Sequence, residues 1–181
     1  MKVLETKRLI LRNFYEKDVY DFYQFAKNHN VTNSAGWKPH NSIEESERLI
    51  NRFIEDDNVW AIVWKENNKV IGCITFKDDI KRLVNDAKMI GYSLCEEYWG
   101  KGIMTEAVNQ VLEYAFQEMC VVSVAAYHFY FNQRSKRVLD KCGFVFESKL
   151  RCSYEMYNGE ILDEYCYSIL REEYLLKHLL K

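Results

Sequence analysis

Two glycines two positions apart, Gly100 and Gly102, stand where a strand-like run passes into a helical pattern. Glycine lets the backbone turn tightly and leaves no side chain over the amide groups. The first amides of the following helix have no intrahelical acceptor and lie at the positive end of the helix dipole. Such a corner suits a phosphate or pyrophosphate group. A glycine pair before a helix also serves an ordinary turn, so the pair alone leaves both interpretations open.

Asn132 and Ser135 form a second candidate pair, at the start of a short helical pattern. Asparagine is a favoured N-cap residue and a serine in the first helical turn is common, so helix capping accounts for both. Capping does not prevent the same groups from facing a ligand. The two residue types therefore fit either a structural role or a binding role.

Carboxylates can act as general bases, and Glu155 and Asp163 are two carboxylates near the C-terminus. Glu155 lies on the strand face that carries Arg151, and a solvated surface carboxylate is the alternative interpretation. Asp163 projects from the same face of the last expected strand as Tyr167 and would act directly or through water. Glu106 is a weaker candidate, because an acid in the first turn of a helix, on a solvent-facing row, needs no further explanation.

Neither the histidines nor the cysteines have the spacing of metal ligands. The cysteines include no C-x-x-C pair, and no motif places a histidine beside one of them. We therefore expect no metal and no cysteine nucleophile, and we interpret the cysteines as free, buried thiols in a reducing cytoplasm. The residues concerned are His29, His40, His128 and His178, and Cys73, Cys95, Cys120, Cys142, Cys152 and Cys166.

The composition excludes several protein classes. A chain of 181 residues with 48% hydrophobic and 29% charged residues can bury a sizeable core, so we expect one domain over residues 1–181. A net charge of -2 gives no electrostatic ground for binding nucleic acid. No apolar run approaches the roughly 20 residues that span a bilayer, and the N-terminus opens into a strand pattern rather than a targeting segment. These observations predict a cytoplasmic protein without a membrane partner.

The hydrophobic periodicity changes repeatedly between strand and helix. A second helix is expected to start at Ser42, with the serine hydroxyl and Glu45 forming a capping box. Residues 33–40 are expected to form a loop before it. Strands 59–64 and 70–76 suit an antiparallel hairpin, and the strand-helix-strand order over 88–126 implies a parallel crossover. The full expected set is strands 8–12, 59–64, 70–76, 88–95, 120–126, 144–152 and 161–170, with helices 19–26, 42–54, 103–118, 132–141 and one from 171.

The element order β-α-α-β-β-β-α-β-α-β-β, with the glycine corner after the fourth strand, resembles the GCN5-related N-acetyltransferase (GNAT) superfamily. The chain is most similar to its ribosomal-protein-alanine N-acetyltransferase-like branch. The resemblance covers essentially the whole chain and implies an α/β fold, a mixed central sheet of about seven strands with helices on both faces. It rests on residues 6–12, 90–94, 98–107, Asn132-x-x-Ser135 and 167–170.

In that family the glycine corner binds the pyrophosphate of acetyl-coenzyme A, so the resemblance implies this co-substrate. The family takes an oxyanion donor from the backbone of its fourth strand, which corresponds here to Tyr92, Ser93 and Leu94. The residues implied at the corner are Gly100, Lys101, Gly102, Ile103, Met104 and Thr105, with the Thr105 hydroxyl as an extra donor.

Two corner positions depart from the family pattern. Trp99 replaces a frequent Arg or Gln, although tryptophan is common in the branch that the chain resembles. Met104 replaces a usual Gly or Ala, and its long side chain would crowd a phosphate unless it points into the core. Its position on the apolar stripe of the helix favours the core. Lys101 is either a phosphate contact or a solvated charge.

The resemblance also implies catalytic roles. It assigns Asn132 to the pantetheine arm and Ser135 to protonation of the departing thiolate. The branch carries a glutamate assigned to catalysis at the position of Glu155, with Asp163 as the second candidate. An α-amine with a pKa near 8 is partly neutral at pH 7, whereas a lysine amine near 10.4 is almost wholly charged, so a base matters more for lysine.

The expected function is acetyl-coenzyme A-dependent transfer of an acetyl group directly to a primary amine in a ternary complex. The acceptor stays open among a protein N-terminus, a polyamine, an aminoglycoside-like antibiotic and another small amine, and the protein is a monomer or a homodimer. Trp37, His40 and Tyr167 are candidates for the amine pocket, with packing on the core as the alternative for Trp37 and His40. A coenzyme A-binding sensor without turnover is the alternative function, which Met104 would favour.

Overall fold

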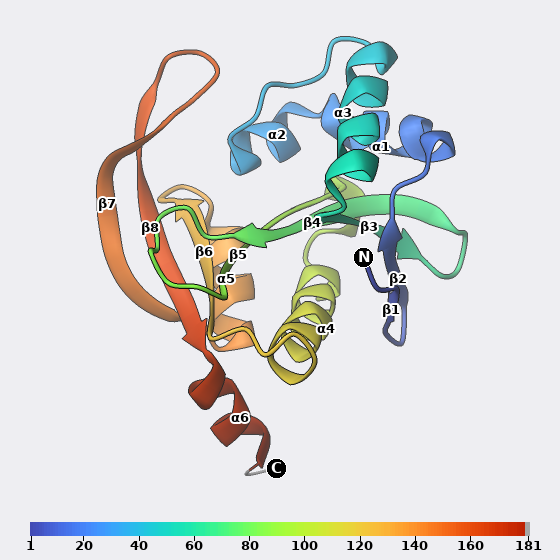
Figure 1. The fold of residues 1–181 in the computed structure, drawn as a ribbon. Coiled ribbons are helices and arrows are strands. Elements are labelled where there is room, and N and C mark those ends of the chain that lie inside the picture. The colour runs from blue at the N-terminus through green and yellow to red at the C-terminus, as the bar shows by residue number, and fades with distance from the viewer. Residues whose placement is uncertain (180–181) are drawn as a thin grey trace. The chain divides into compact units, whose positions relative to one another are not determined.

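The computed structural model describes residues 1–179, which form a mixed α/β structure with eight strands in one sheet and six α-helices (Figure 1). The strand order is β1-β2-β3-β4-β5-β6-β8-β7. The chain divides into two compact units. Unit 1 comprises 1–75 and 92–107, and unit 2 comprises 76–91 and 108–181. Side chains are described as far as Lys177, so the expectation for His178 lies outside the described residues.

Unit 1 begins with an antiparallel set of strands. β2 pairs with β3 in continuous register from Leu9↔Trp64 to Asn13↔Trp60, and β3 pairs in turn with β4. The residues of β3 read VWAIVW and are buried from Val59 to Val63. Such a run suits a strand inside a sheet with both faces covered. The strands of this unit are β1 (Leu4–Glu5), β2 (Leu9–Asn13), β3 (Val59–Trp64) and the first part of β4 (Lys69–Asp78).

Three helices of unit 1 gather around an aromatic core (Figure 1). Phe22 is completely buried, and its ring centroid lies 5.6 Å from that of Phe14, 4.9 Å from that of Phe25 and 5.9 Å from that of Phe53. Edge-to-face pairs of this kind each contribute about 0.5–1.5 kcal/mol beyond the burial of their area. The helices are α1 (Val19–Ala26), α2 (His29–Ala35) and α3 (Ile43–Asp56).

Unit 2 is built on β6, β8 and β7, and the last two form a long hairpin (Figure 1). The ladder between β7 and β8 contains two register shifts, one between Phe146 and Ser148 and one between Leu150 and Tyr154. β5 and β6 pair in parallel over three residues, from Ala87↔Ser123 to Met89↔Ala125. Two elements are shared between the units, because β5 ends in unit 1 and α4 begins there. The elements are β5 (Ala87–Leu94), α4 (Ile103–Gln117), β6 (Ser123–Phe129), α5 (Gln133–Cys142), β7 (Val145–Glu155), β8 (Ile161–Leu170) and α6 (Arg171–Leu179).

The structure confirms the expected α/β class, the antiparallel hairpin and the parallel crossover. The sheet has eight strands and not about seven, because Leu4–Glu5 forms a short additional strand on β2. The expected loop 33–40 is also partly wrong. Its first three residues belong to α2, where the Asn28 side chain accepts a hydrogen bond from the Asn30 amide (2.8 Å) and so caps the helix.

Two local expectations fail for backbone reasons. The strand expected from Cys120 begins only at Ser123, because Cys120 has a φ of 56°, far from the extended backbone of a regular strand. Ser42 stands at the N-cap of α3, but its hydroxyl makes no capping hydrogen bond there. The Glu45 carboxylate instead accepts from the Asn41 amide (2.8 Å), one residue before the expected partner.

The six cysteines are all free thiols, but they are not all buried. Cys73 and Cys142 are buried, and burial raises the pKa of each thiol to about 12. The expectation of burial is wrong for Cys120 and Cys152, which are exposed. Both have a positive φ, of 56° and 49°, and such residues interrupt a strand instead of packing inside it.

Glu106, in the first turn of α4, anchors the start of that helix to the turn between β1 and β2. Its Oε1 accepts hydrogen bonds from the Thr6 hydroxyl (2.6 Å) and the Arg8 amide (3.0 Å), and its Oε2 lies 2.7 Å from Arg8 Nε. The side chain is 21% exposed, so its interpretation as a solvent-facing acid is wrong. Burial acts to raise the pKa of Glu106, but the hydrogen bonds from Thr6 and Arg8 outweigh it and lower the pKa below its usual value.

We predict that Glu106→Gln lowers the free energy of unfolding at pH 7 by about 2 kcal/mol, the range for hydrogen bonds to a charged group. Because the folded-state pKa is lowered, the carboxylate stabilises the protein above its unfolded pKa and loses this effect as the pH falls through the folded pKa. Urea unfolding of both proteins at pH 7 and near pH 3 should therefore show a difference that shrinks in acid. An equal difference at both pH values would contradict the stabilising role of the ionised Glu106 carboxylate. Glu113→Gln, at an exposed position of α4, serves as the control.

Candidate functional site

The glycine corner presents unpaired backbone donors at the start of α4. Gly100 and Gly102 have φ values of 75° and 72°, in the left-handed region that glycine adopts without strain. Within the described part of the chain, the amide groups of residues 101–104 have no hydrogen-bond acceptor. Donors arranged in this way before the positive end of a helix dipole form an anion site.

Arg8, the residue immediately before β2, holds the corner in place. Its Nη1 donates to the carbonyl of Lys101 (3.0 Å), while its Nε bonds Glu106 (2.7 Å). A Cβ added at Gly102 would lie 3.9 Å from Arg8 Nη2, which is an ordinary contact. The backbone conformation, and not a lack of space, therefore requires glycine at this position.

The two departures from the family pattern are structurally accommodated. Met104 is 6% exposed, so its side chain packs in the core and does not cover the corner amides. Trp99 packs against the core of unit 1 and donates its indole N–H to the carbonyl of Leu94 (2.8 Å). The expectation that Met104 points into the core is confirmed.

A cavity of about 480 Å³ lies beside the corner. Two carboxylates, Glu66 and Glu97, contribute to its wall and disfavour a phosphate there. The Lys101 ammonium lies over the Tyr98 ring, 5.4 Å from its centroid. The donors available to an anion are consequently the amides of the corner and not this cavity. The complete lining is Trp64, Glu66, Asn67, Glu97, Tyr98 and Lys101.

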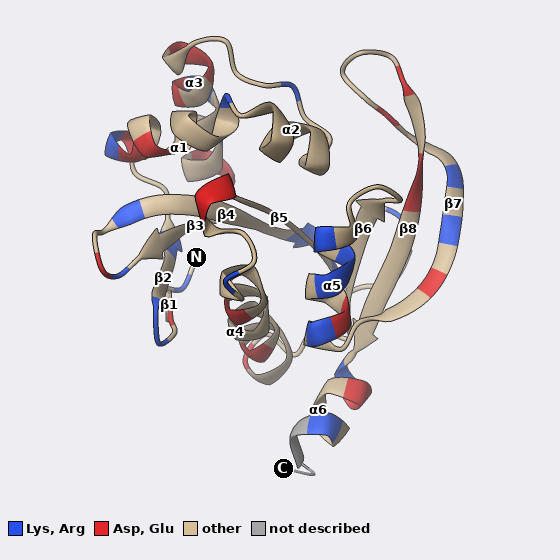
Figure 2. Cartoon of the chain, turned by 180° about the vertical axis from the view of Figure 1, so that it is seen from behind, with Lys and Arg blue, Asp and Glu red and all other residues tan. Residues whose placement is uncertain are grey.

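Asn132 and Ser135 occupy the first turn of α5 in unit 2. Asn132 is the N-cap residue, and its side-chain oxygen accepts a hydrogen bond from the Ser135 amide (3.0 Å). The capping interaction therefore uses the backbone of Ser135 and not its hydroxyl. The same helix carries several basic side chains, which Figure 2 shows in blue along α5: Arg134, Lys136, Arg137 and Lys141.

The two candidate bases differ in their surroundings. Glu155 is the exposed last residue of β7, and its carboxylate has no hydrogen bond or ion pair among the residues that the structure describes. Asp163 is engaged, because it forms an ion pair with Lys149 (2.7 Å) and accepts from the Cys152 amide (2.8 Å). The hydrogen bond from Lys149 and then that from Cys152 lower the pKa of Asp163, which makes it a weaker base.

The three candidates for an amine pocket are all packed against other aromatic rings. Trp37 stacks on Phe22, with ring centroids 6.1 Å apart. His40 lies 5.7 Å from the Trp37 ring, and its Nδ1 is 2.7 Å from the Ser46 hydroxyl. Burial is the main cause that lowers the pKa of His40. Tyr167 is 5% exposed. These contacts favour packing on the core, the alternative given above for Trp37 and His40.

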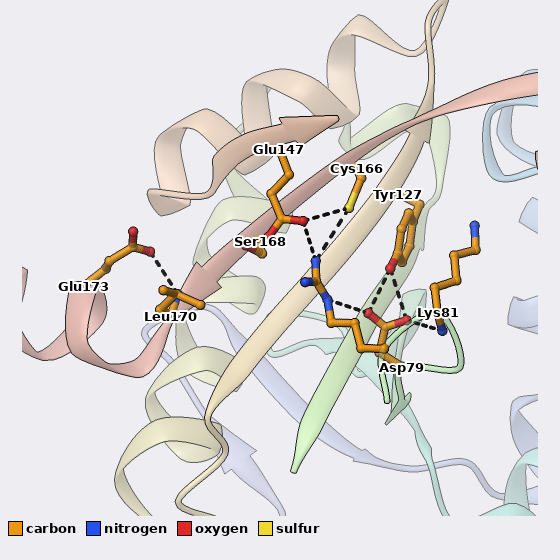
Figure 3. Close-up of polar contacts among 9 residues, drawn as sticks. Asp79, Lys81, Tyr127, Glu147, Cys166, Ser168, Leu170 and Glu173 are labelled. Atoms are coloured by element: carbon orange, nitrogen blue, oxygen red, sulfur yellow. Dashed lines mark hydrogen bonds and ion pairs between the residues drawn. The ribbon is translucent and has the colours of Figure 1, made fainter. Parts of the chain in front are cut away.

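A charge cluster in unit 2, around the buried carboxylate of Asp79, was not found from the sequence (Figure 3). Arg82 pairs through Nε with Asp79 (3.0 Å) and through Nη2 with Glu147 (2.7 Å). The Tyr127 hydroxyl donates to Asp79 (2.8 Å), whose side chain is fully buried, and the Ser168 hydroxyl donates to Glu147. The cluster fastens the segment between β4 and β5 onto β6, β7 and β8. Because its members are 48 and 65 positions apart, no local spacing indicates it.

The charges of this cluster influence one another. Burial acts to raise the pKa of Glu147, but the hydrogen bonds from Arg82 and Ser168 outweigh it and hold that pKa below its usual value. Burial, followed by the Glu147 charge, raises the pKa of the Cys166 thiol to about 11. Lys81 pairs with Glu164 and lies 4.1 Å from the centroid of the Tyr127 ring.

Two further properties follow from the described residues. They contain no group of three or more histidine, cysteine, aspartate or glutamate side chains arranged to hold a metal ion. No described helix has the length and apolar character needed to cross a membrane.

Comparison with known proteins shows the family of this chain. The family model described as "Acetyltransferase (GNAT) domain" matches residues 8–145. The uncharacterized N-acetyltransferase YoaA of Bacillus subtilis (strain 168) is 31% identical over 174 residues, covering 93% of this chain and 97% of the relative. The structure of ribosomal-protein-S5-alanine acetyltransferase from Vibrio fischeri is 26% identical, with a TM-score of 0.76 and coverage of 96% of this chain and 98% of the other. Spermidine N-acetyltransferase from Vibrio cholerae, in complex with CoA and spermine, shares the fold at 22% identity, with a TM-score of 0.77 and coverage of 94% and 99%.

We predict that Arg82→Met lowers the free energy of unfolding at pH 7 by about 3 kcal/mol, because it leaves the carboxylates of Asp79 and Glu147 without their cation. Arg82→Lys should recover part of the loss, since an ammonium cannot bridge both carboxylates as a guanidinium does. Chemical unfolding measures both variants. Lys136→Met, which breaks the exposed pair with Asp140, is the matched control and should change the free energy of unfolding far less, because exposed ion pairs contribute little. A loss of the same small size for Arg82→Met would show that the cluster does not stabilise unit 2.

Proposed function

This chain belongs to the GNAT acetyltransferase family and is an N-acetyltransferase, and from that premise we propose that it transfers an acetyl group from acetyl-coenzyme A directly to a primary amine. The observation that carries the proposal is the glycine corner, where the amides of residues 101–104 lack acceptors within the described chain. These donors suit the pyrophosphate of the co-substrate. The Thr105 hydroxyl is an additional donor in this proposal.

We assign the remaining roles residue by residue. Acetyl-coenzyme A supplies the acetyl group as a thioester. A backbone amide in the last residues of β5, Tyr92–Leu94, stabilises the oxyanion of the tetrahedral intermediate. Asn132 binds the pantetheine arm, and the Ser135 hydroxyl gives its proton to the departing thiolate. A thiol with a pKa near 8.5 is a good leaving group, so the serine accelerates a step that is already feasible.

Glu155 is the proposed base for the acceptor amine. Its carboxylate is exposed and unpaired among the described residues, whereas Asp163 is held by Lys149 and has a lowered pKa. An α-amine is partly neutral at pH 7, so its acetylation depends less on a base than that of a lysine amine does. A protein N-terminus is therefore one acceptor class, as the name of the Vibrio fischeri protein suggests, and a small amine is the other, as that of the Vibrio cholerae protein suggests.

The alternative of a coenzyme A-binding sensor without turnover depended on Met104. That side chain is buried and leaves the corner amides uncovered, so the feature that favoured a sensor is absent. Thiol release from acetyl-coenzyme A, measured with N-terminal peptides and with small amines, tests the enzyme directly. Binding of acetyl-coenzyme A without release for any amine would support the sensor.

We predict that Gly102→Val weakens binding of acetyl-coenzyme A strongly, by about a hundredfold or more, because valine cannot adopt a φ of 72° without strain and the corner amides would turn away. Calorimetric titration measures the affinity, and circular dichroism checks that the variant is folded. Gly159→Val is the matched control, since Gly159 has a φ of 83° in the β7–β8 turn and carries no proposed donor. Unchanged affinity in a folded Gly102→Val variant would remove the corner from the proposal.

We predict that Ser135→Ala lowers kcat by about a hundredfold and leaves the affinity for acetyl-coenzyme A within a factor of two, because proton transfer to the thiolate acts in the transition state. The melting temperature, measured in parallel, shows whether the hydroxyl also has a structural role. Ser153→Ala, which also removes a half-buried hydroxyl in unit 2, is the control. A lower melting temperature with normal kcat would instead make the hydroxyl a structural group.

A further inference from the structure

The cavity beside the glycine corner has a wall that suits a positively charged ligand. Its volume of about 480 Å³ lies in the range of binding sites for small molecules. All of its lining residues belong to unit 1, and they come from the end of β3, the turn between β3 and β4, and the segment 97–101. The proposed acetyl transfer assigns no role to any of these side chains.

Two carboxylates in this wall can accept hydrogen bonds from a ligand. The Glu97 carboxylate has no hydrogen bond or ion pair among the residues that the structure describes. Glu66 accepts the indole N–H of Trp64 at Oε2 (3.1 Å), and no described group donates to its Oε1. The ammonium of Lys101 forms an ion pair with neither carboxylate. Two carboxylates and one ammonium leave one negative charge in excess, so a ligand with a single positive charge balances the wall.

Two aromatic rings in the wall favour a cation over a neutral polar group. The ring centroids of Trp64 and Tyr98 lie 5.6 Å apart, with an angle of 58° between the planes. The face of an aromatic ring attracts a cation within about 6 Å of its centroid. Two cations of this chain already use these rings, because Arg8 lies 5.7 Å from the Trp64 centroid and the Lys101 ammonium lies 5.4 Å from that of Tyr98. Arg8 does not line the cavity, which leaves Lys101 as the cation of its wall.

Elsewhere in the chain the same partners hold a guanidinium group. Arg12 lies over the Tyr15 ring, 4.4 Å from its centroid, and pairs with Asp18 (2.7 Å). Arg82 bridges two carboxylates that come from different segments. A planar guanidinium can do both at once, because its N–H groups form a fork and its face stacks on an aromatic ring, whereas an ammonium is a compact and more strongly hydrated charge. The wall of the cavity offers both kinds of partner.

We propose that this cavity binds a guanidinium group, carried by a small molecule or by an arginine side chain of another protein. The N–H groups of the ligand donate to the carboxylates of Glu66 and Glu97, and its plane packs against the aromatic pair. The ligand competes with the Lys101 ammonium for the face of Tyr98, because like charges on one ring repel each other. The inference goes beyond the proposed function and does not depend on it.

Calorimetric titration of the wild-type protein with butylguanidinium chloride, at constant ionic strength and without acetyl-coenzyme A, tests the assignment. We expect saturable binding with a Kd in the millimolar range, the level of a few hydrogen bonds and one stacked ring. Butylurea, a neutral molecule of nearly the same shape, should show no saturable binding, and butylammonium should bind severalfold more weakly. N-acetylarginine amide presents the group as a protein does, so the tighter of the two guanidinium probes identifies the source.

Two variants of the wall should act in opposite directions. Glu97→Gln should weaken binding of butylguanidinium about tenfold, because it removes a charged acceptor and keeps the shape of the side chain. Lys101→Met should strengthen binding about threefold, because it removes the competing cation. Glu47→Gln, which removes an exposed carboxylate of α3 that does not line the cavity, is the matched control and should leave the affinity within a factor of two.

The absence of saturable binding of both guanidinium probes to the folded wild type overturns the inference. Equal binding of butylurea or of butylammonium does so too, because the cavity would then not distinguish a guanidinium group. Wild-type affinity in Glu97→Gln, with circular dichroism showing a folded variant, also overturns it. All three results leave the proposed function standing, since that function is tested by binding of acetyl-coenzyme A and by thiol release.

Discussion

The guanidinium of Arg8 fixes the point at which α4 begins, and the candidate site of unit 1 depends on that point. One side chain bonds both the Lys101 carbonyl, inside the corner, and the Glu106 carboxylate, in the first turn of the helix. The corner is thereby tied to β2, which the register with β3 holds in the sheet. Preorganised amides bind an anion without first having to be ordered, so rigidity here favours affinity.

The polar groups buried in unit 2 divide into two kinds. The Asp79, Arg82 and Glu147 cluster is satisfied internally, because each carboxylate has a cation and at least one hydroxyl donor. Groups of this kind hold a structure in one arrangement. His128 is different, since its Nε2 has no donor among the described residues.

The parts of the fold that the sequence predicts well are those with a local cause. β3 has the expected bounds because it is an apolar run between polar residues, and β8 begins where expected because it follows the Asn158-Gly159 turn. The corner was also expected, since glycine itself marks the backbone conformation that the site requires. The short β1 and α2 were missed, because two strand residues and seven helical ones are too few to show a period.

Side-chain roles that depend on distant partners could not be obtained in the same way. The acid at position 106 has an unremarkable local context, and its partners Thr6 and Arg8 lie 100 and 98 residues earlier in the chain. The ion cluster around Arg82 combines residues of three strands and a loop. The spacing of these residues in the sequence does not indicate that they meet. The orphaned nitrogen of His128 is a property of packing alone. Only the three-dimensional arrangement distinguishes it from an ordinary core histidine.

The irregular β7 has a consequence for contacts between molecules. β7 ends the strand order, so one of its edges is open, and Val145 and Phe146 are exposed beside it. A strand from a second molecule could add to that edge only along a regular run of backbone donors and acceptors. The two register shifts and the positive φ of Cys152 break the run into short pieces. An edge broken in this way protects a long, curved hairpin from growing strand by strand into an aggregate.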